Sequence, residues 1–209
     1  MEILEDKQIN LRFIRIIAIL FIVGMCINLY FIGLKENEKS TEVQTEAIDV
    51  IDDQLPVPFN NEIEVYSEMY GLDPYLVAAV IKTESGFDKD IVSSMGAVGL
   101  MQIMPSTGEW IARQLNIQGF SAEMLKDEDV NIEMGCWYLN YLRSQLKHTN
   151  EVLAAYNGGI GNVFKWLQDP RYSKDGEVIN AIPFKETVSY IEKVVVVYNE
   201  YMDLYKIEE

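Results

Sequence analysis

The longest apolar run in the chain lies near its N-terminus. Residues 16–34 read IIAILFIVGMCINLYFIGL, contain no charged side chain and are about as long as a helix that spans a bilayer. Lysine and arginine precede the run, whereas acidic residues follow it. Because basic residues favour the cytoplasmic side of a membrane, we expect residues 1–15 in the cytoplasm, a single transmembrane anchor over 16–34, and the rest of the chain outside.

A cleaved signal peptide is the alternative interpretation of this run. The run is longer than a typical signal-peptide core, and no A-x-A-like cleavage site follows it. Met25 precedes Cys26, where a lipoprotein would carry a small residue. The sequence therefore favours an uncleaved anchor in the cell membrane, with the following domain extracytoplasmic.

A polar segment follows the apolar run and precedes the first helical pattern. Residues 35–59 carry Pro56 and Pro58 near their end, and positions 36–59 hold seven acids and one lysine without a clear period. Such a self-repelling composition is typical of extended linkers. We therefore expect a flexible acidic linker over 35–59 and one folded domain over 60–209.

Apolar positions recur at helical spacing as soon as the linker ends. A first helix is predicted over Glu62–Tyr70, with Gly71 as its stop. Asp73 has the properties of an N-cap, and Pro74 suits the first position of a second helix. That helix is expected to run through Thr83-Glu84-Ser85 and to end at Gly86.

Five more helices are predicted from the same signals. Ser106 and Glu109 form a capping box for the next helix, and Asn150 is expected to cap a short one. The expected helices carry residues 110–115, span 129–146 and 152–156, carry 163–167, and span 185–205. The long helix shows one wide apolar stripe that should be buried, formed by Val130, Met134, Trp137, Tyr138, Tyr141 and Leu142. No alternating strand pattern is present, so the sequence predicts a mainly α fold.

The charge balance narrows the classes of partner. The net charge is −16, with 17 basic residues against 33 acidic ones, so nucleic acid is not an expected partner. A glycan would have to be held by hydrogen bonds and aromatic stacking. The one histidine, His148, lies in a polar stretch and provides neither a zinc motif nor a catalytic triad. The sequence suggests no metal and no organic cofactor.

Glu84 is the first candidate for chemistry. It is predicted on the last turn of an otherwise apolar helix, where the partial negative charge of the helix end and burial both disfavour a carboxylate. Both effects should raise its pKa, and glycosidic bond cleavage needs a carboxyl group that is protonated near neutral pH. From this local pattern alone, an ordinary exposed glutamate remains the alternative.

Five segments in a fixed order carry a more specific signal. They are E-S at 84–85, S-x-x-G-A-x-G-L-M-Q over 93–102, VNIEMGCWYL over 130–139, A-Y-N over 155–157, and the tyrosine at 190. Together they cover about residues 62–200 and resemble the soluble-type lytic transglycosylase family, whose fold is similar to goose-type lysozyme. The resemblance implies a lysozyme-like helical domain with a groove for a sugar strand.

The resemblance also implies a reaction on peptidoglycan. The glutamate at position 84 would protonate the oxygen that links N-acetylmuramic acid to N-acetylglucosamine. Its carboxylate would then take a proton from the muramoyl 6-hydroxyl, which closes on C1 and leaves a 1,6-anhydro end. One carboxylate is enough because the internal hydroxyl replaces the water that ordinary glycosidases activate with a second acid.

The family motifs imply supporting roles for eight residues. Ser85 would hydrogen-bond near the leaving sugar, and Tyr190 would place its hydroxyl close to Glu84. Tyr156 and Asn157 would help to hold the substrate. The groove would be lined by Gly99, Leu100, Met101 and Gln102.

Other interpretations remain open at this stage. Asp88 or Asp90 could supply a second carboxylate and make the protein a lysozyme-like hydrolase on the same fold. A membrane-tethered peptidoglycan-binding module without activity is the alternative from another class, but it would predict loss of the acid at position 84. The expected partners are peptidoglycan glycan strands and, through residues 16–34, the membrane. A role beside wall-remodelling, secretion or conjugation machinery does not exclude the enzyme.

Overall fold

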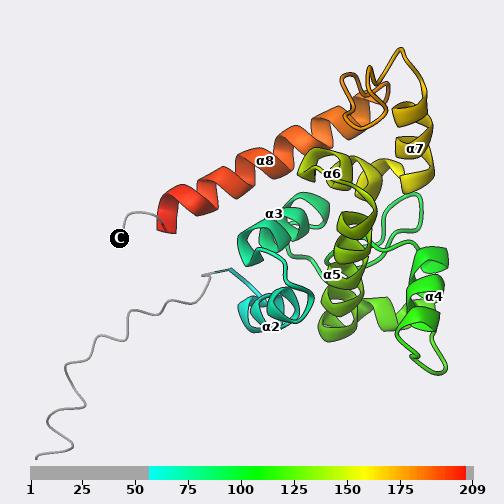
Figure 1. Ribbon diagram of the computed structural model, residues 1–209. Helices are drawn as coiled ribbons and strands as arrows, with labels where there is room; N and C mark the ends of the chain where they lie inside the picture. The colour runs from blue at the N-terminus through cyan, green and yellow to red at the C-terminus, as the bar shows by residue number, and fades with distance from the viewer. Residues whose placement is uncertain (1–56, 206–209) are drawn as a thin grey trace, which may run out of the picture. The chain divides into compact units, whose positions relative to one another are not determined.

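The computed structural model describes residues 57–205. The predicted anchor at 16–34, the segment 1–15 and nearly all of the linker at 35–59 lie outside the described residues. Within 57–205 the chain is helical, with only the isolated bridges Val92–Val98 and Val98–Ile103 besides helices and turns. The elements are α2 Asn60–Tyr70, α3 Pro74–Glu84, α4 Pro105–Gln114, the 3-10 helix η1 Ala122–Lys126, α5 Glu128–Gln145, α6 Thr149–Gly158, α7 Ile160–Gln168 and α8 Lys185–Tyr205 (Figure 1).

No helix between residues 57 and 205 has both the length and the apolar character that crossing a membrane requires.

The boundary between α2 and α3 follows the predicted signals. Gly71 ends α2 with a φ of 62°, a left-handed conformation that glycine adopts without a steric penalty. The Asp73 carboxylate accepts the backbone N–H of Tyr75 at 2.9 Å, and Pro74 is the first residue of α3. The predicted N-cap and N1 residues are therefore confirmed.

Two other predicted caps are wrong. Helix α4 begins at Pro105, after Met104, and no side chain caps it, because proline's fixed φ starts the helix one residue before Ser106. Glu109 instead pairs with Arg113 at 2.9 Å. Helix α6 begins at Thr149, so Asn150 lies inside its first turn rather than at its cap.

The buried face of α5 also differs from the predicted stripe. Met134 and Leu142 are fully buried as expected, but Trp137, Tyr138 and Tyr141 are only half-buried. The buried positions on this helix also include Asn131, Ile132, Gly135, Cys136 and Leu139. Helix α5 packs against α2, α4, α6 and η1 and lies among these elements in Figure 1, so more than one of its faces is covered. The three aromatic residues Trp137, Tyr138 and Tyr141 lie on the part of α5 that stays partly exposed.

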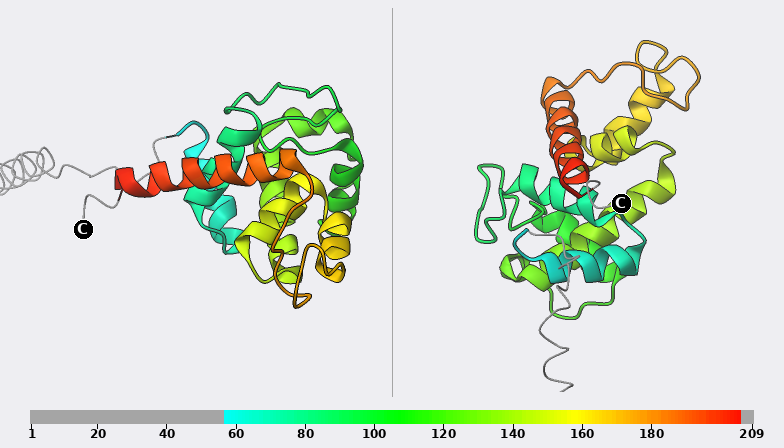
Figure 2. Two further views of the ribbon diagram at one scale, coloured as in Figure 1. Left: turned by 90° about the horizontal axis from the view of Figure 1, so that it is seen from above. Right: turned by 90° about the vertical axis from the view of Figure 1, so that its left-hand side faces the viewer.

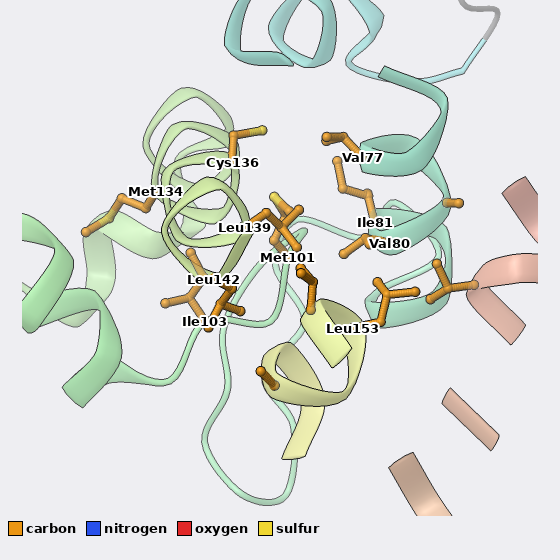
Figure 3. Packing of buried hydrophobic residues seen from close by; sticks show 14 of the residues in the cluster. Val77, Val80, Ile81, Met101, Ile103, Met134, Cys136, Leu139, Leu142 and Leu153 are labelled. Atoms are coloured by element: carbon orange, nitrogen blue, oxygen red, sulfur yellow. The ribbon is translucent and has the colours of Figure 1, made fainter. Parts of the chain in front are cut away.

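The core gathers around the facing sides of α3 and α5. Figure 3 shows Val77 and Ile81 of α3 opposite Cys136 and Leu139 of α5, with Met101 of the intervening loop between them. All five side chains are at most 2% exposed. Since burial of such side chains is the main favourable term in folding, this cluster fixes the end of α3 relative to the loop and α5.

Helix α8 brings the last part of the chain back to α3. Helix α8 packs along α3, and the C-terminal end of α8 extends beyond α3 (Figures 1 and 2). The Tyr198 hydroxyl donates to Asp73 Oδ2 at 2.7 Å, which ties α8 to the N-cap of α3. With the two helices held in this register, Tyr190 of α8 lies next to Glu84 at the other end of α3.

Candidate active site

Glu84 is the last residue of α3 and is mostly enclosed by its neighbours. Burial raises the pKa of its carboxyl from the ordinary 4.5 to about 7, and the hydroxyl of Tyr190 lowers it in part. None of the ion pairs among residues 57–205 includes Glu84. Because no cation offsets its desolvation, the group keeps its proton close to neutral pH.

Two tyrosines interact with this carboxyl, Tyr190, which is buried, and Tyr156, which is half-buried. Tyr190 comes from α8 and Tyr156 from α6, and both have their pKa raised by burial first and by the charge of Glu84 second. The Tyr156 hydroxyl donates to the Met101 carbonyl at 2.8 Å. The Tyr190 hydroxyl forms no hydrogen bond of ordinary distance and angle within the protein, although it lies close enough to Glu84 to lower the pKa of that carboxyl. The structure thus brings together three predicted site residues from three helices.

Ser85 fixes the path of the chain directly after Glu84. Its hydroxyl donates to the Ile81 carbonyl at 3.1 Å and accepts the Phe87 N–H at 3.1 Å. Gly86 follows with a φ of 61°. This hydroxyl therefore helps to end α3, and its predicted contact with the leaving sugar stays a prediction.

The loop that carries the predicted groove residues is organised by Asn131, which is 1% exposed. Its Oδ1 accepts the Met101 N–H at 2.7 Å, while its Nδ2 donates to the carbonyls of Val98 and Leu125 at 3.0 and 2.7 Å. Asn131 belongs to the 130–139 segment of the family resemblance, which implied no role for it. A polar side chain among the buried positions of α5 is the signal that could have indicated this role, because buried amides almost always have hydrogen-bond partners.

The predicted groove residues differ in how accessible they are. Gly99, Leu100 and Met101 are buried, with Leu100 and Met101 at 0% exposure. A Cβ on Gly99 would lie 2.2 Å from the Leu125 carbonyl oxygen, so glycine is required there by close packing. Groove lining by these three residues stays a prediction, and in this structure the side chains of Leu100 and Met101 belong to the core.

Gln102 and Asn157 are accessible and are held by hydrogen bonds within the protein. Gln102 is half-buried with a φ of 49°, and its Nε2 donates to the Gly99 carbonyl at 2.9 Å. Asn157 is exposed, and its Oδ1 accepts the Thr187 hydroxyl at 2.9 Å. Their predicted contacts with substrate stay predictions.

An aromatic hollow that the sequence pattern did not predict opens beside Tyr138. It has a volume of about 380 Å³ and is lined by Ser106, Thr107, Trp110, Tyr138, Tyr141 and Ile160. The Trp110 ring meets Tyr141 edge-on at 5.0 Å between centroids, and Tyr138 lies 5.6 Å from Tyr156. Tyr156 in turn lies next to Glu84, so aromatic side chains connect the hollow to the carboxyl. Such surfaces offer apolar faces together with hydroxyl groups.

The described residues hold no group of three or more His, Cys, Asp or Glu side chains that could bind a metal. The two other acids considered at the sequence level, Asp88 and Asp90, are exposed. Asp88 accepts the Asp90 N–H at 3.0 Å within the loop.

A helical frame that presents one half-buried glutamate with a raised pKa beside aromatic side chains is typical of a lysozyme-like domain. Residues 61–179 match the family model described as the Transglycosylase SLT domain. The chain belongs to this family.

Curated relatives carry names from the same family. The chain is 32% identical over 150 residues to the soluble lytic murein transglycosylase of Escherichia coli (strain K12), which covers 70% of this chain and 23% of the relative. It is 39% identical over 158 residues to the endo-type membrane-bound lytic murein transglycosylase A of Klebsiella pneumoniae (strain 342), covering 65% of this chain and 77% of the relative. The chain thus spans less than a quarter of the length of the soluble relative.

Solved structures support the fold. The lytic transglycosylase Slt of Pseudomonas aeruginosa, solved as an inactive mutant, is 30% identical, with a TM-score of 0.63 over 80% of this chain and 27% of its own. The complex of the 70-kDa soluble lytic transglycosylase with bulgecin A is 28% identical, with a TM-score of 0.62 over 77% of this chain and 26% of its own.

Proposed function

We propose that this protein is a peptidoglycan lytic transglycosylase that cleaves the β-1,4 bond between N-acetylmuramic acid and N-acetylglucosamine without water and leaves 1,6-anhydro ends. Glu84 serves first as general acid and then as general base. The observation that carries the proposal is the pKa of about 7 that burial gives this carboxyl. Such a group can be protonated before bond cleavage and can release and regain a proton near neutral pH.

A single carboxyl is sufficient for this reaction. In the first step the Glu84 proton moves to the glycosidic oxygen, which leaves with the N-acetylglucosamine fragment. In the second step the muramoyl 6-hydroxyl attacks C1 and gives its proton to the Glu84 carboxylate, so the enzyme returns to its starting state. The exposure of Asp88 and Asp90 favours this route over a hydrolase with two carboxylates, because solvated acids in a loop are poorly placed to act together with Glu84.

The tyrosines and the aromatic hollow supply the other requirements. Tyr190 tunes the carboxyl, since its hydroxyl favours the ionised form that the second step uses. The hollow beside Tyr138 accepts sugar rings on the faces of Trp110 and Tyr141. Polar contacts from Ser85, Gln102 and Asn157 orient the acetamido and hydroxyl groups, because serine and amide side chains offer both donors and acceptors.

Anchoring in the cell membrane is part of the proposal. The uncharged run over 16–34 supports a single-pass anchor with the N-terminus in the cytoplasm, and the name of the Klebsiella relative is compatible with it. The acidic linker over 35–59 would let the catalytic domain reach glycan strands outside the membrane. A place beside wall-remodelling, secretion or conjugation machinery is consistent with such a tether.

The experiment that tests the proposal is mass spectrometry of the soluble products released from peptidoglycan by the full-length protein in detergent, with Glu84→Gln run in parallel. Muropeptides with 1,6-anhydro-muramic acid ends, absent with Glu84→Gln, are the expected result. Reducing ends that carry one added water would make the protein a hydrolase instead. Retained wall binding without products from either protein would indicate a binding module.

A further inference from the structure

A second cavity lies away from Glu84, between the start of α6, the loop before α8 and the first turns of α8. Its volume is about 140 Å³. Its polar lining residues are Asn150 and Glu151 of α6 and Glu192 of α8, and the apolar ones are Ile179, Ile182, Val188 and Ile191. None of these residues has a role in the site around Glu84, so the cavity needs its own explanation.

Glu151 is the unusual member of this set. It is 3% exposed, and none of the ion pairs in the described part of the chain includes it. Its Oε1 accepts the Ile179 N–H at 3.1 Å, whereas its Oε2 has no hydrogen-bond partner in the protein. A buried carboxyl oxygen without a donor is costly, so a group that donates to it would bind favourably.

The walls define the chemistry of that donor. Four aliphatic side chains favour methylene groups, and two carboxyls favour a cation while they repel an anion. Glu192 is exposed, so it stands at the outer side of the cavity, with Glu151 inside. At about 30 Å³ per water-sized group, the volume accommodates roughly four or five non-hydrogen atoms. A primary ammonium on a short alkyl chain meets all of these conditions.

We propose that this cavity binds a primary alkylammonium group, with Glu151 Oε2 as the inner acceptor and Glu192 as the outer one. The group could be the side chain of a lysine-like residue in a peptide or a free alkylamine, which share the same chemistry. Because Oε2 is covered in this structure, the ammonium reaches it only when the loop carrying Ile179 shifts. The proposal does not rest on the lytic reaction, and its test does not use activity.

The test is ligand-observed saturation-transfer NMR on the full-length protein in detergent, with n-butylamine as the probe at pH 7, where it is protonated. n-Butanol keeps the four-carbon chain but carries no charge. Butyrate also has four carbons but carries a negative charge. We expect saturable binding of butylammonium alone. Equal binding of butanol, or no binding of butylammonium, would overturn the proposal.

Matched variants locate the site. Glu151→Gln removes the charge without changing the shape and should weaken butylammonium binding by about tenfold or more, and Glu192→Gln by a smaller factor. Glu68→Gln, on the exposed surface of α2, should leave binding unchanged. Binding that is unaffected by Glu151→Gln, in a variant whose circular dichroism matches the wild type, would also overturn the proposal.

A second pair of probes separates the two sources of the ammonium group. The first probe is Nα-acetyl-lysine amide. If it binds as well as butylamine does, and if acetylation of its Nε abolishes binding, the result supports a peptide side chain as the ligand. Binding of butylamine without binding of the lysine derivative supports a free amine. If Glu151→Gln should fail to fold, the comparison of butylamine with butanol on the wild-type protein still decides the proposal.

Discussion

Tyr190 of α8 lies against Glu84 at the end of α3, and its hydroxyl lowers the pKa of that carboxyl while burial raises it. The two residues are far apart in sequence and meet only because α8 packs along α3. Tyr190 is 7% exposed, and its hydroxyl is buried without an ordinary hydrogen bond within the protein. The Glu84 carboxyl is the charged group whose pKa this hydroxyl affects.

The first prediction concerns the pH dependence of activity. Cleavage needs protonated Glu84, so kcat/KM should fall as the pH rises through about 7. Tyr190→Phe removes a hydroxyl that lowers the pKa of Glu84, so this alkaline limb should move to higher pH. Tyr198→Phe, on the same helix but bonded to Asp73, should leave the limb in place. A limb that moves to lower pH in Tyr190→Phe would contradict this role.

The second prediction concerns stability. The folded protein holds the Glu84 proton more tightly than the unfolded chain does, because the pKa rises from 4.5 to about 7 on folding. The carboxyl therefore destabilises the fold progressively between pH 4.5 and 7, and by a constant amount above 7. Glu84→Gln should raise the free energy of unfolding by about 3 kcal/mol at pH 8, from a pKa that rises from 4.5 to about 7, and change it little at pH 4. Urea unfolding at both pH values measures this, and an equal effect at the two would count against a raised pKa.

The third prediction concerns Asn131. Asn131→Ala removes the side chain that pairs with the Met101 N–H and the Leu125 carbonyl, and one of two donors to the Val98 carbonyl, which keeps the Ile103 N–H. It should therefore lower the free energy of unfolding by about 3 kcal/mol. Asn140→Ala, on the more open face of α5, should change it by less than about 0.5 kcal/mol. Chemical denaturation of both variants provides the comparison, and similar losses would show that the hydrogen bonds of Asn131 contribute little.

The fourth prediction compares two glycines with similar backbone angles. Gly99 has a φ of 79° and no room for a Cβ, while Gly119 has a φ of 67° and no other atom within 4 Å of that position. Gly119→Ala should cost about 1–2 kcal/mol of stability from backbone strain alone. Gly99→Ala should cost clearly more, because the new methyl group meets the Leu125 carbonyl. Thermal unfolding of the two variants tests whether close packing or backbone strain dominates at Gly99.

The fifth prediction concerns the aromatic hollow. Trp110→Ala should raise KM for glycan strands about three- to tenfold, since it removes one stacking surface. The pH limb set by Glu84 should not move. Phe164→Ala, an exposed aromatic on α7 that does not line the hollow, is the matched control. Unchanged KM in Trp110→Ala would remove the hollow from the substrate path.

Local signals in the sequence were sufficient for most helices. Gly71, Asp73 and Pro74 define the boundary between α2 and α3 through backbone conformation and capping, which act within a few residues. The range of α8 was predicted as Lys185–Tyr205 and is confirmed. The capping box at Ser106 failed because Pro105 competes for the same helix start.

The sequence by itself determined the helical architecture, the order of the family motifs and Glu84 as the first candidate for catalysis. The family resemblance already implied that Tyr190 lies close to Glu84. Only the tertiary structure decided that Asn131 holds the loop near Met101, and that the side chains of Leu100 and Met101 lie in the core. The reason is physical: helix boundaries depend on neighbours along the chain, whereas burial, and the pKa that follows from it, depends on residues that only packing brings together.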